Sequence, residues 1–453
     1  MTNVLVITGD PIGSRLAGPA IRAWNISKVL SESNDVVLLT TGKLDEAIEA
    51  PFGLRYLRPG SEREFSALEQ WADVILFQGY ALEQFKTLRE SSKIVVADIY
   101  DPLQLEVLEQ GRSLPNATWE VKVAEARRVM NQQLIFADYF LCSSERQKLF
   151  YIGQLAALGR LNPQNYGADS SLSQMIEVVP FGLDAVPPKM SRDAIREHAS
   201  RIGPDDKILI WGGGIYEWFD PKTLIRAVAN LSSSGKHVCL YFLGTKHPRL
   251  EPMGIVAESI ALAEELGVLD QSVFFNENWV DYRERADYLL GANAGVSTHF
   301  SSLETTLSFR TRILDYLWAG LPMIVTEGDV FSELVKKEEM GQVVKEGDVL
   351  GLSKAIESVL YDEELVARFR KNVKRVREQY FWPTVLQPLV DFVGSPRHAP
   401  DFENRNRRKV SELAKSQRAY GIWHNIRMTI HYLKVSGPKA TVSRVSRKLK
   451  DNP

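Results

Sequence analysis

The stretch SSLETTLSFRTRILDYLWAGLPMIV, residues 301–325, combines a helix pattern with a strand and places charge where a helix does not favour it. Apolar residues recur at helical spacing after Ser308, which is a typical N-cap residue. Arg310 and Arg312 fall in the first turn, where positive charge opposes the helix dipole unless the helix start binds an anion. Asp315 follows about one turn later, and the glycine of WAGLP ends the helix before a buried strand. Two interpretations follow: an anion site, or a surface helix with two solvated arginines.

The segments around this stretch alternate short apolar strands with helices, which is typical of parallel sheets with right-handed crossovers. A polar stretch with prolines divides the alternation into two groups. The sequence therefore predicts an α/β fold of two doubly wound Rossmann-like domains that face each other across a cleft. The expected parts are a first domain over 1–182, a linker over 183–204, a second domain over 205–378, closing helices over 379–397, and a basic helical tail over 398–453.

Composition excludes some classes of protein and sets the tail apart from the body. The chain has 453 residues, 44% of them hydrophobic and 25% charged, as in ordinary globular proteins. No run of about 18 apolar residues predicts a membrane-spanning helix, and the N-terminus does not resemble a signal peptide. The net charge of −2 hides an asymmetry, because residues 405–450 hold thirteen Lys or Arg and one Glu. That segment carries +12, which leaves −14 for the remaining chain.

The loops after strands are the places to look for ligands in such sheets. The loop after the first strand contains Gly18, which allows close backbone approach, and Arg22 follows in the next helix. Asp98 and Asp101 end the strand of KIVVADIYDP and could bind sugar hydroxyls or act as a base. Asp101 could equally cap the following helix.

The loop GGGIYEWFDP opens the second domain with three consecutive glycines. Gly213 and Gly214 would expose backbone amides to a phosphate or a sugar. Trp218 could stack on a ring of the ligand, or it could pack between the domains. Further along, Lys246 is available to an anion. Together with the arginines of 301–325, these loops favour an anionic nucleotide ligand in the cleft.

The chain resembles glycosyltransferase family 4, glycosyl transferases group 1, which have the GT-B fold. VVPFGLD at 178–184 resembles the segment that ends the family's first domain, and LDYLWAGLPMIV resembles its signature helix and strand. The resemblance extends from residue 1 to about 395. In the family this helix carries the second Glu of a Glu-x7-Glu motif, five residues before a Gly. Here that position is Asp315, so the resemblance implies that Asp315 binds the ribose hydroxyls of the nucleotide.

The resemblance also implies which residues bind the sugar and the diphosphate. The first Glu of the motif would fall on Leu307, which cannot serve, and Glu304 is the nearest candidate. The family uses backbone amides at this place, here those of Thr305, Thr306, Leu307 and Ser308. Two departures concern the chemistry. The glycine loop lacks the family's Arg and Lys, for which Arg310, Arg312 and Lys246 could substitute. Many family members also carry a His near the reacting sugar in the first domain. This chain has no His before His198, so either Asp98 or Asp101 replaces it or no such group is needed.

The expected function is therefore sugar transfer from a nucleotide-diphosphate sugar to an acceptor hydroxyl, in cell-surface polysaccharide or glycolipid synthesis. Asp98, Asp101, Arg310 and Arg312 are the candidate catalytic residues. Other members of family 4 retain the anomeric configuration, so retention is the expectation by resemblance. No D-x-D pattern follows a strand, so we expect no metal and no cofactor beyond the substrate itself. One alternative is a GT-B nucleotide-sugar epimerase.

The basic tail suggests a second partner. Trp423, Ile426, Ile430 and Leu433 line one face of a predicted helix rich in Lys and Arg, which suits an anionic membrane surface. The acceptor would then be lipid-linked, and the protein would be cytoplasmic, peripheral on the inner face of the membrane. The tail could instead be a solvated arm, or the chain could be a non-catalytic protein that binds nucleic acid through it. The acidic body and the lack of a nucleic-acid motif argue against nucleic acid.

Overall fold

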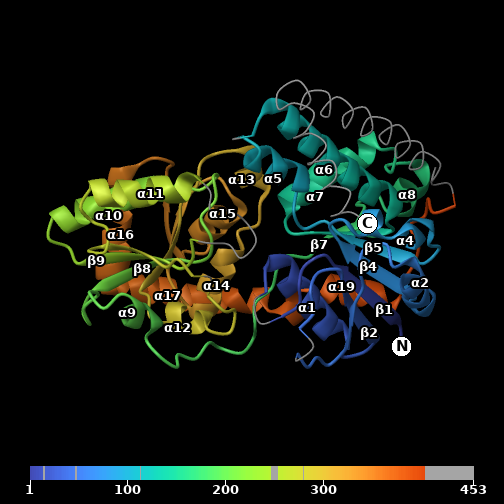
Figure 1. The fold of residues 1–453 in the computed structure, drawn as a ribbon, viewed down its shortest axis with the longest axis horizontal. Coiled ribbons are helices and arrows are strands. Elements are labelled where there is room, and N and C mark those ends of the chain that lie inside the picture. The colour runs from blue at the N-terminus through green and yellow to red at the C-terminus, as the bar shows by residue number, and fades with distance from the viewer. Residues whose placement is uncertain (14–15, 46–47, 113, 246–253, 279, 404–453) are drawn as a thin grey trace, which may run out of the picture. The chain divides into compact units, whose positions relative to one another are not determined.

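The structure is a computed structural model that describes residues 1–13, 16–45, 48–112, 114–245, 254–278 and 280–403 (Figure 1). Met1–Phe402 form one compact unit with two separate parallel sheets. Within the described residues, no helix has both the length and the hydropathy needed to cross a bilayer. The aromatic and basic residues on which the tail prediction rests lie outside the described part of the chain.

The first domain has a seven-stranded parallel sheet in the order β3-β2-β1-β4-β5-β6-β7. Its central strands consist almost entirely of buried apolar residues, because helices cover both faces of the sheet. The strands are β1 (Asn3–Thr8), β2 (Asp35–Thr40), β3 (Gly53–Tyr56), β4 (Val74–Gln78), β5 (Ile94–Asp98), β6 (Tyr139–Cys142) and β7 (Ile176–Val178). The helices are α1 (Gly18–Leu30), α2 (Glu62–Trp71), α3 (Ala81–Gln84), α4 (Lys86–Glu90), α5 (Leu103–Gln110), α6 (Asn116–Phe136), α7 (Glu145–Ala157) and α8 (Pro163–Ala168).

The second domain repeats this plan with a six-stranded parallel sheet in the order β10-β9-β8-β11-β12-β13. The strands are β8 (Lys207–Trp211), β9 (Val238–Phe242), β10 (Val273–Phe275), β11 (Ala294–Ser297), β12 (Met323–Thr326) and β13 (Gly341–Val344). The helices are α9 (Ala194–His198), α10 (Pro221–Ser233), α11 (Gly254–Glu265), α12 (Arg285–Leu289), α13 (Leu303–Leu307), α14 (Thr311–Ala319), α15 (Val330–Lys337), α16 (Val349–Tyr361) and α17 (Glu363–Arg377). In each sheet the strand order reverses beside the first strand, and ligands of such sheets bind at that point.

The chain then returns to the first domain through a short 3-10 helix, Glu378–Tyr380, followed by α18 (Trp382–Val385) and α19 (Gln387–Gly394). Where it crosses, the Leu183 amide donates to the Tyr380 carbonyl at 2.7 Å, and the Trp382 amide donates to the Leu183 carbonyl at 3.1 Å. The aromatic ring of Phe392 in α19 stacks on that of Tyr139 in the first sheet, with centroids 4.1 Å apart. The two domains are therefore joined by two chain segments that pair with each other.

These observations confirm the predicted pair of doubly wound domains and refine the boundaries. The packed body extends past the predicted limit at residue 397, because Asp401 forms a buried ion pair with Arg160 at 2.8 Å. The predicted linker is also shorter, since Asp287 of α12 accepts hydrogen bonds from the amide and hydroxyl of Ser191. Two strands, β3 and β13, were not expected from the sequence.

Candidate functional site

A cavity opens between the carboxyl ends of the two sheets. The first domain contributes the start of α1 and the segments that follow β5 and β7. The second contributes the glycine loop after β8, the segment 280–285, and the α13–α14 region. Its volume is about 480 Å³, which falls within the ~300–1,000 Å³ range of small-molecule sites.

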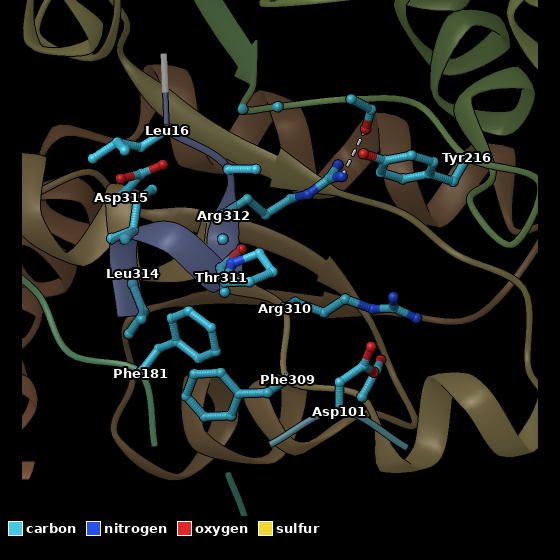
Figure 2. A pocket seen from close by; sticks show the side chains of 18 of the residues that line it. Leu16, Asp101, Phe181, Tyr216, Phe309, Arg310, Thr311, Arg312, Leu314 and Asp315 are labelled. Atoms are coloured by element: carbon cyan, nitrogen blue, oxygen red, sulfur yellow. Dashed lines mark hydrogen bonds between the residues drawn. The ribbon is translucent and has the colours of Figure 1, made fainter. Parts of the chain in front are cut away.

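The helix expected to begin after Ser308 begins at Thr311, and a short helix, α13, precedes it. Ser308 ends α13, and α14 begins at Thr311 with Arg310 as its N-cap residue. No side chain caps this helix start, and in the described part of the chain the amides of Thr311 and Arg312 have no acceptor. Arg310 and Thr311 both line the cavity. The positive end of α14 therefore faces the ligand space (Figure 2).

Arg312 is a buried cation that forms no direct ion pair with a carboxylate among the described residues. One Nη donates to the Gly214 carbonyl at 2.9 Å, and the other has no partner in the described residues. The guanidinium carbon lies over the rings of Trp211 and Phe219, at 4.4 and 4.0 Å from their centroids. Burial lowers the pKa of Arg312 to about 10. A buried charge of this kind is costly alone and favours an anion beside it.

Arg310 extends from the start of α14 toward the same space but has its own counter-ion (Figure 2). Its two Nη atoms donate to the two carboxylate oxygens of Glu304 at 3.0 and 2.8 Å, and one also contacts the Thr305 hydroxyl at 3.2 Å. Both side chains of the pair are buried. Glu304 therefore neutralises and orients Arg310, and the two arginines differ in the charge that they offer a ligand.

A second acidic group lines the cavity from the first domain. Asp101 follows β5 and lies near the Arg310 guanidinium in Figure 2. Burial raises the pKa of Asp101 well above its usual value, helped by the Glu106 carboxylate and a hydrogen bond with it, whereas Arg310 opposes the rise. Glu106, at the start of α5, lines the same cavity. A protonated carboxyl here could donate a hydrogen bond to a sugar oxygen.

Asp315 lies on α14 and forms an ion pair with Arg285 at 3.2 Å. The Arg285 guanidinium lies over the Tyr282 and Trp318 rings, with its carbon 3.6 and 4.1 Å from their centroids. The Asp315 side chain is 38% exposed and lines the cavity. Burial raises its pKa and Arg285 opposes the rise. Since Arg285 occupies one carboxylate oxygen, the other can accept from a hydroxyl group.

The glycine loop gives the cavity a wall of backbone. Gly213 has a φ of +88°, which side chains other than glycine rarely adopt. A Cβ at Gly214 would lie 3.1 Å from the Tyr216 ring. Trp218 stacks on Tyr216 with centroids 5.0 Å apart, and its indole nitrogen has no partner among the described residues. All four residues line the cavity, as does Gly18 at the start of α1.

Asp98 and Arg22, predicted to face the cleft, instead form a fully buried ion pair with each other at 2.7 Å. Arg22 also donates to the carbonyls of Val179 and Pro180, and Asp98 accepts from Gln78. Neither side chain lines the cavity, because both are fully buried inside the first domain. The pair fixes the segment after β7 against the start of α1.

The backbone amides predicted to bind the diphosphate are used within α13. Those of Thr305, Thr306 and Ser308 donate to the Ser302 hydroxyl, the Ser302 carbonyl and the Glu304 carbonyl. Leu307 is buried inside the same short helix. The free amides are those of Thr311 and Arg312, three residues further on. Lys246 lies outside the described residues.

Sequence reasoning missed Arg285, Tyr282, Glu106 and Thr311. Arg285 and Tyr282 stand 30 or more residues before Asp315, and their pairing with α14 arises only from the tertiary fold. Thr311 was hidden by the Ser308 cap signal. Glu106 could have been found, because it lies one helical turn after the Asp101-Pro102 pair.

Comparisons with known proteins show which family and which folds the chain resembles. Residues 193–376 match the family model of glycosyl transferases group 1. A search of curated proteins found no significant match. Sucrose-phosphate synthase from Thermosynechococcus elongatus superposes with a TM-score of 0.63 at 17% identity, over 86% of this chain and 98% of that chain. HepE from Anabaena, in complex with UDP-glucose, superposes with a TM-score of 0.61 at 15% identity, over 87% of this chain and 100% of that chain. WaaG, a glycosyltransferase involved in lipopolysaccharide biosynthesis, superposes with a TM-score of 0.59 at 14% identity, over 86% of this chain and 100% of that chain.

These matches confirm the resemblance predicted from the signature helix. The structural similarity confirms the two-domain GT-B fold. The family match covers most of the second domain, with α13, α14 and the glycine loop, and confirms the expected enzyme class, a glycosyltransferase.

Proposed function

We propose that this chain, whose second domain is a glycosyl transferases group 1 domain, transfers a sugar from a nucleotide-diphosphate sugar to an acceptor hydroxyl. The observation that carries the proposal is the unneutralised Arg312 beside the uncapped start of α14. A diphosphate provides the negative charge that this pair of features favours. HepE from Anabaena, whose fold is similar, forms complexes with UDP and with UDP-glucose, which makes UDP-sugars the first donors to test.

The proposed role of each group follows from its position. Asp315 accepts hydrogen bonds from the ribose hydroxyls, while Arg285 holds its carboxylate. Breaking the glycosidic C–O bond leaves negative charge on the diphosphate, which Arg312 and the amides of Thr311 and Arg312 stabilise. Loss of one such donor in other enzymes raises the barrier by about 2.7–4 kcal/mol. The acceptor enters from the first domain, beside Asp101 and Glu106. These two carboxyl groups are the proposed partners of sugar hydroxyls.

The finer parts of the proposal rest on resemblance and charge. We propose retention of the anomeric configuration, as in other members of family 4. Catalysis would need no metal, because Arg312 and the helix start supply the positive charge at the leaving group. The proposed acceptor is a lipid-linked sugar of the cell surface, at the inner face of the membrane. The +12 segment at 405–450 and the similarity to WaaG, a protein of lipopolysaccharide biosynthesis, support this choice.

A panel of nucleotide sugars tests the proposal. Thermal unfolding is measured with UDP-, GDP- and ADP-sugars, because a ligand at 100 times its Kd adds about 2.7 kcal/mol of stability. We expect one nucleotide class to raise Tm by several degrees and to release nucleoside diphosphate when an acceptor sugar is added. Sugar turnover without any acceptor would indicate an epimerase. No stabilisation by any member of the panel would contradict the proposal.

A further inference from the structure

Two consecutive side chains of the first domain bind the backbone of the second domain next to the anion site. Arg146 and Gln147 lie in the first turn of α7, behind the N-cap Ser144. Arg146 donates to the carbonyls of Thr306 at 3.1 Å and Gly328 at 2.8 Å. Gln147 donates to the Leu307 carbonyl at 2.8 Å. These contacts connect α7 to the end of α13.

The carbonyls involved are ones that a helix cannot satisfy by itself. The last turn of α13 leaves carbonyl groups without intrahelical donors. Most helices bond such groups to water or to their own flanking residues. Here the donors for Thr306 and Leu307 come from the other domain. The contact therefore depends on the arrangement of the two domains, whereas the helix itself does not.

Gln147 is built into the first domain as a rigid donor. Its side chain is fully buried, and its carbonyl oxygen accepts from the Ser143 amide at 2.8 Å while its NH₂ group reaches Leu307. Its backbone amide also donates to the Ser144 hydroxyl at 3.2 Å. Both ends of the side chain amide are thus used, so its position is set by β6 and the start of α7.

The end of α13 leads directly into the site. Only Ser308 and Phe309 separate Leu307 from Arg310 and the start of α14. Glu304, the counter-ion of Arg310, stands on the same short helix. A shift of the α13 end would therefore move the Arg310–Glu304 pair and the free amides of α14 together.

We propose that Arg146 and Gln147 are positioning residues that set the α13–α14 junction when the two domains come together. This proposal rests on the function proposed above, since it assigns the junction to the diphosphate of the donor. The anion site and the domain contact are then coupled: an anion at α14 strengthens the contact with α7, and the contact strengthens anion binding by the same factor.

Hydrogen exchange and calorimetry test the coupling with two variants and one control. Arg146→Gln removes the guanidinium contacts, and Gln147→Met removes the amide contacts at nearly constant length. Lys148→Gln is the matched control on the same helix, because Lys148 pairs with Glu177 inside the first domain. In the ligand-free protein we expect exchange over residues 303–315 to be about tenfold faster in both variants than in the wild type and the control.

Inorganic pyrophosphate then serves as the anion. Its affinity should fall about tenfold in both variants and stay unchanged in Lys148→Gln. It should also slow exchange across α7 in the wild type and the control, but not in Arg146→Gln. If Arg146 only stabilised the fold, pyrophosphate bound at α14 would not slow exchange in α7 through it. If Gln147→Met does not fold, Arg146→Gln alone decides.

Two outcomes separate the two proposals. Wild-type exchange rates and wild-type pyrophosphate affinity in Arg146→Gln would overturn the positioning role. Faster exchange over 303–315 in the variants, in a protein whose wild type binds no pyrophosphate, would support the positioning contacts and contradict the anion site itself.

Discussion

Arg310 and Arg312 stand two positions apart, and the fold gives them opposite electrostatic surroundings. Arg310 is held by Glu304 in a buried pair, whereas Arg312 donates to a carbonyl and lies over two aromatic rings, with no direct carboxylate partner in the described part of the chain. Side chains two apart on a helix point in different directions, which lets one stabilise the site and the other bind the ligand.

The Arg310–Glu304 pair predicts a stability effect. Arg310→Met should lower the free energy of unfolding by about 3–5 kcal/mol, because Glu304 is left buried without its counter-ion. The double variant Arg310→Met/Glu304→Leu should recover much of that loss. Chemical denaturation of the three proteins measures both effects. A double variant no more stable than the single one would show that the pair is not the source of the loss.

Asp101 predicts a pH effect on stability. Its pKa is raised in the folded protein by burial and by Glu106. The contribution of Asp101 to folding stability is therefore complete below about pH 4, the usual pKa of Asp, and is lost as the pH rises through the raised pKa. Asp101→Asn should therefore stabilise the protein at pH 7 and leave it unchanged at pH 4. Each unit of pKa elevation is equivalent to about 1.4 kcal/mol. Equal effects of the substitution at both pH values would contradict this assignment.

Many of the individual site residues could be predicted from the sequence. The residues that were predicted wrongly or not at all have partners that lie far away in the sequence. Arg312 and Asp315 line the cavity, and their positions on the predicted helix were enough to select them as candidates. Arg22 and Asp98 were misassigned because they lie 76 positions apart, and no local pattern reveals that they neutralise each other. Arg285 was missed for the same reason.

At the scale of helices and strands, strongly apolar segments were predicted well and edges poorly. The alternating apolar strands and helices expected from the sequence are present in both domains. The two strands that were not expected, β3 and β13, are edge strands in which only Val344 is buried, so their apolar signal is weak. The short helix α13 was not expected, because a five-residue helix is too short to show an apolar period.

The end of α14 gives a prediction at this scale. Gly320 ends the helix with a φ of +72°, which costs other residues about 1–2 kcal/mol. Gly320→Ala should destabilise the protein by that amount in denaturant titration. Gly153→Ala is the control, since Gly153 is exposed within α7 and a Cβ there meets nothing within 4 Å. Gly153→Ala should stabilise the protein by about 0.5–1 kcal/mol. Equal effects of the two substitutions would refute the role of Gly320.

For the whole molecule, the proposed membrane contact is the basic segment at 405–450. The buried Arg160–Asp401 ion pair lies at the end of the folded body. A chain that ends at residue 403 therefore keeps this ion pair. We expect this truncated protein to bind the donor with unchanged affinity and to lose binding to anionic liposomes. Raised salt should weaken the binding of the full chain, because exposed charges are screened. Equal cosedimentation of both proteins would exclude the segment as the anchor.

The measurement that tests the central claim most directly is calorimetric binding of a nucleoside diphosphate and its monophosphate. The nucleotide is the one selected by the panel of donors, and the proteins are the wild type and Arg312→Gln. A hydrogen bond to a charged group contributes about 1.5–3 kcal/mol, or roughly ten- to hundredfold in affinity. The wild type should prefer the diphosphate by at least that factor, and Arg312→Gln should lose the preference while it still binds the monophosphate. A variant that keeps the full preference for the diphosphate would contradict the assignment of Arg312 and the start of α14 to the leaving group.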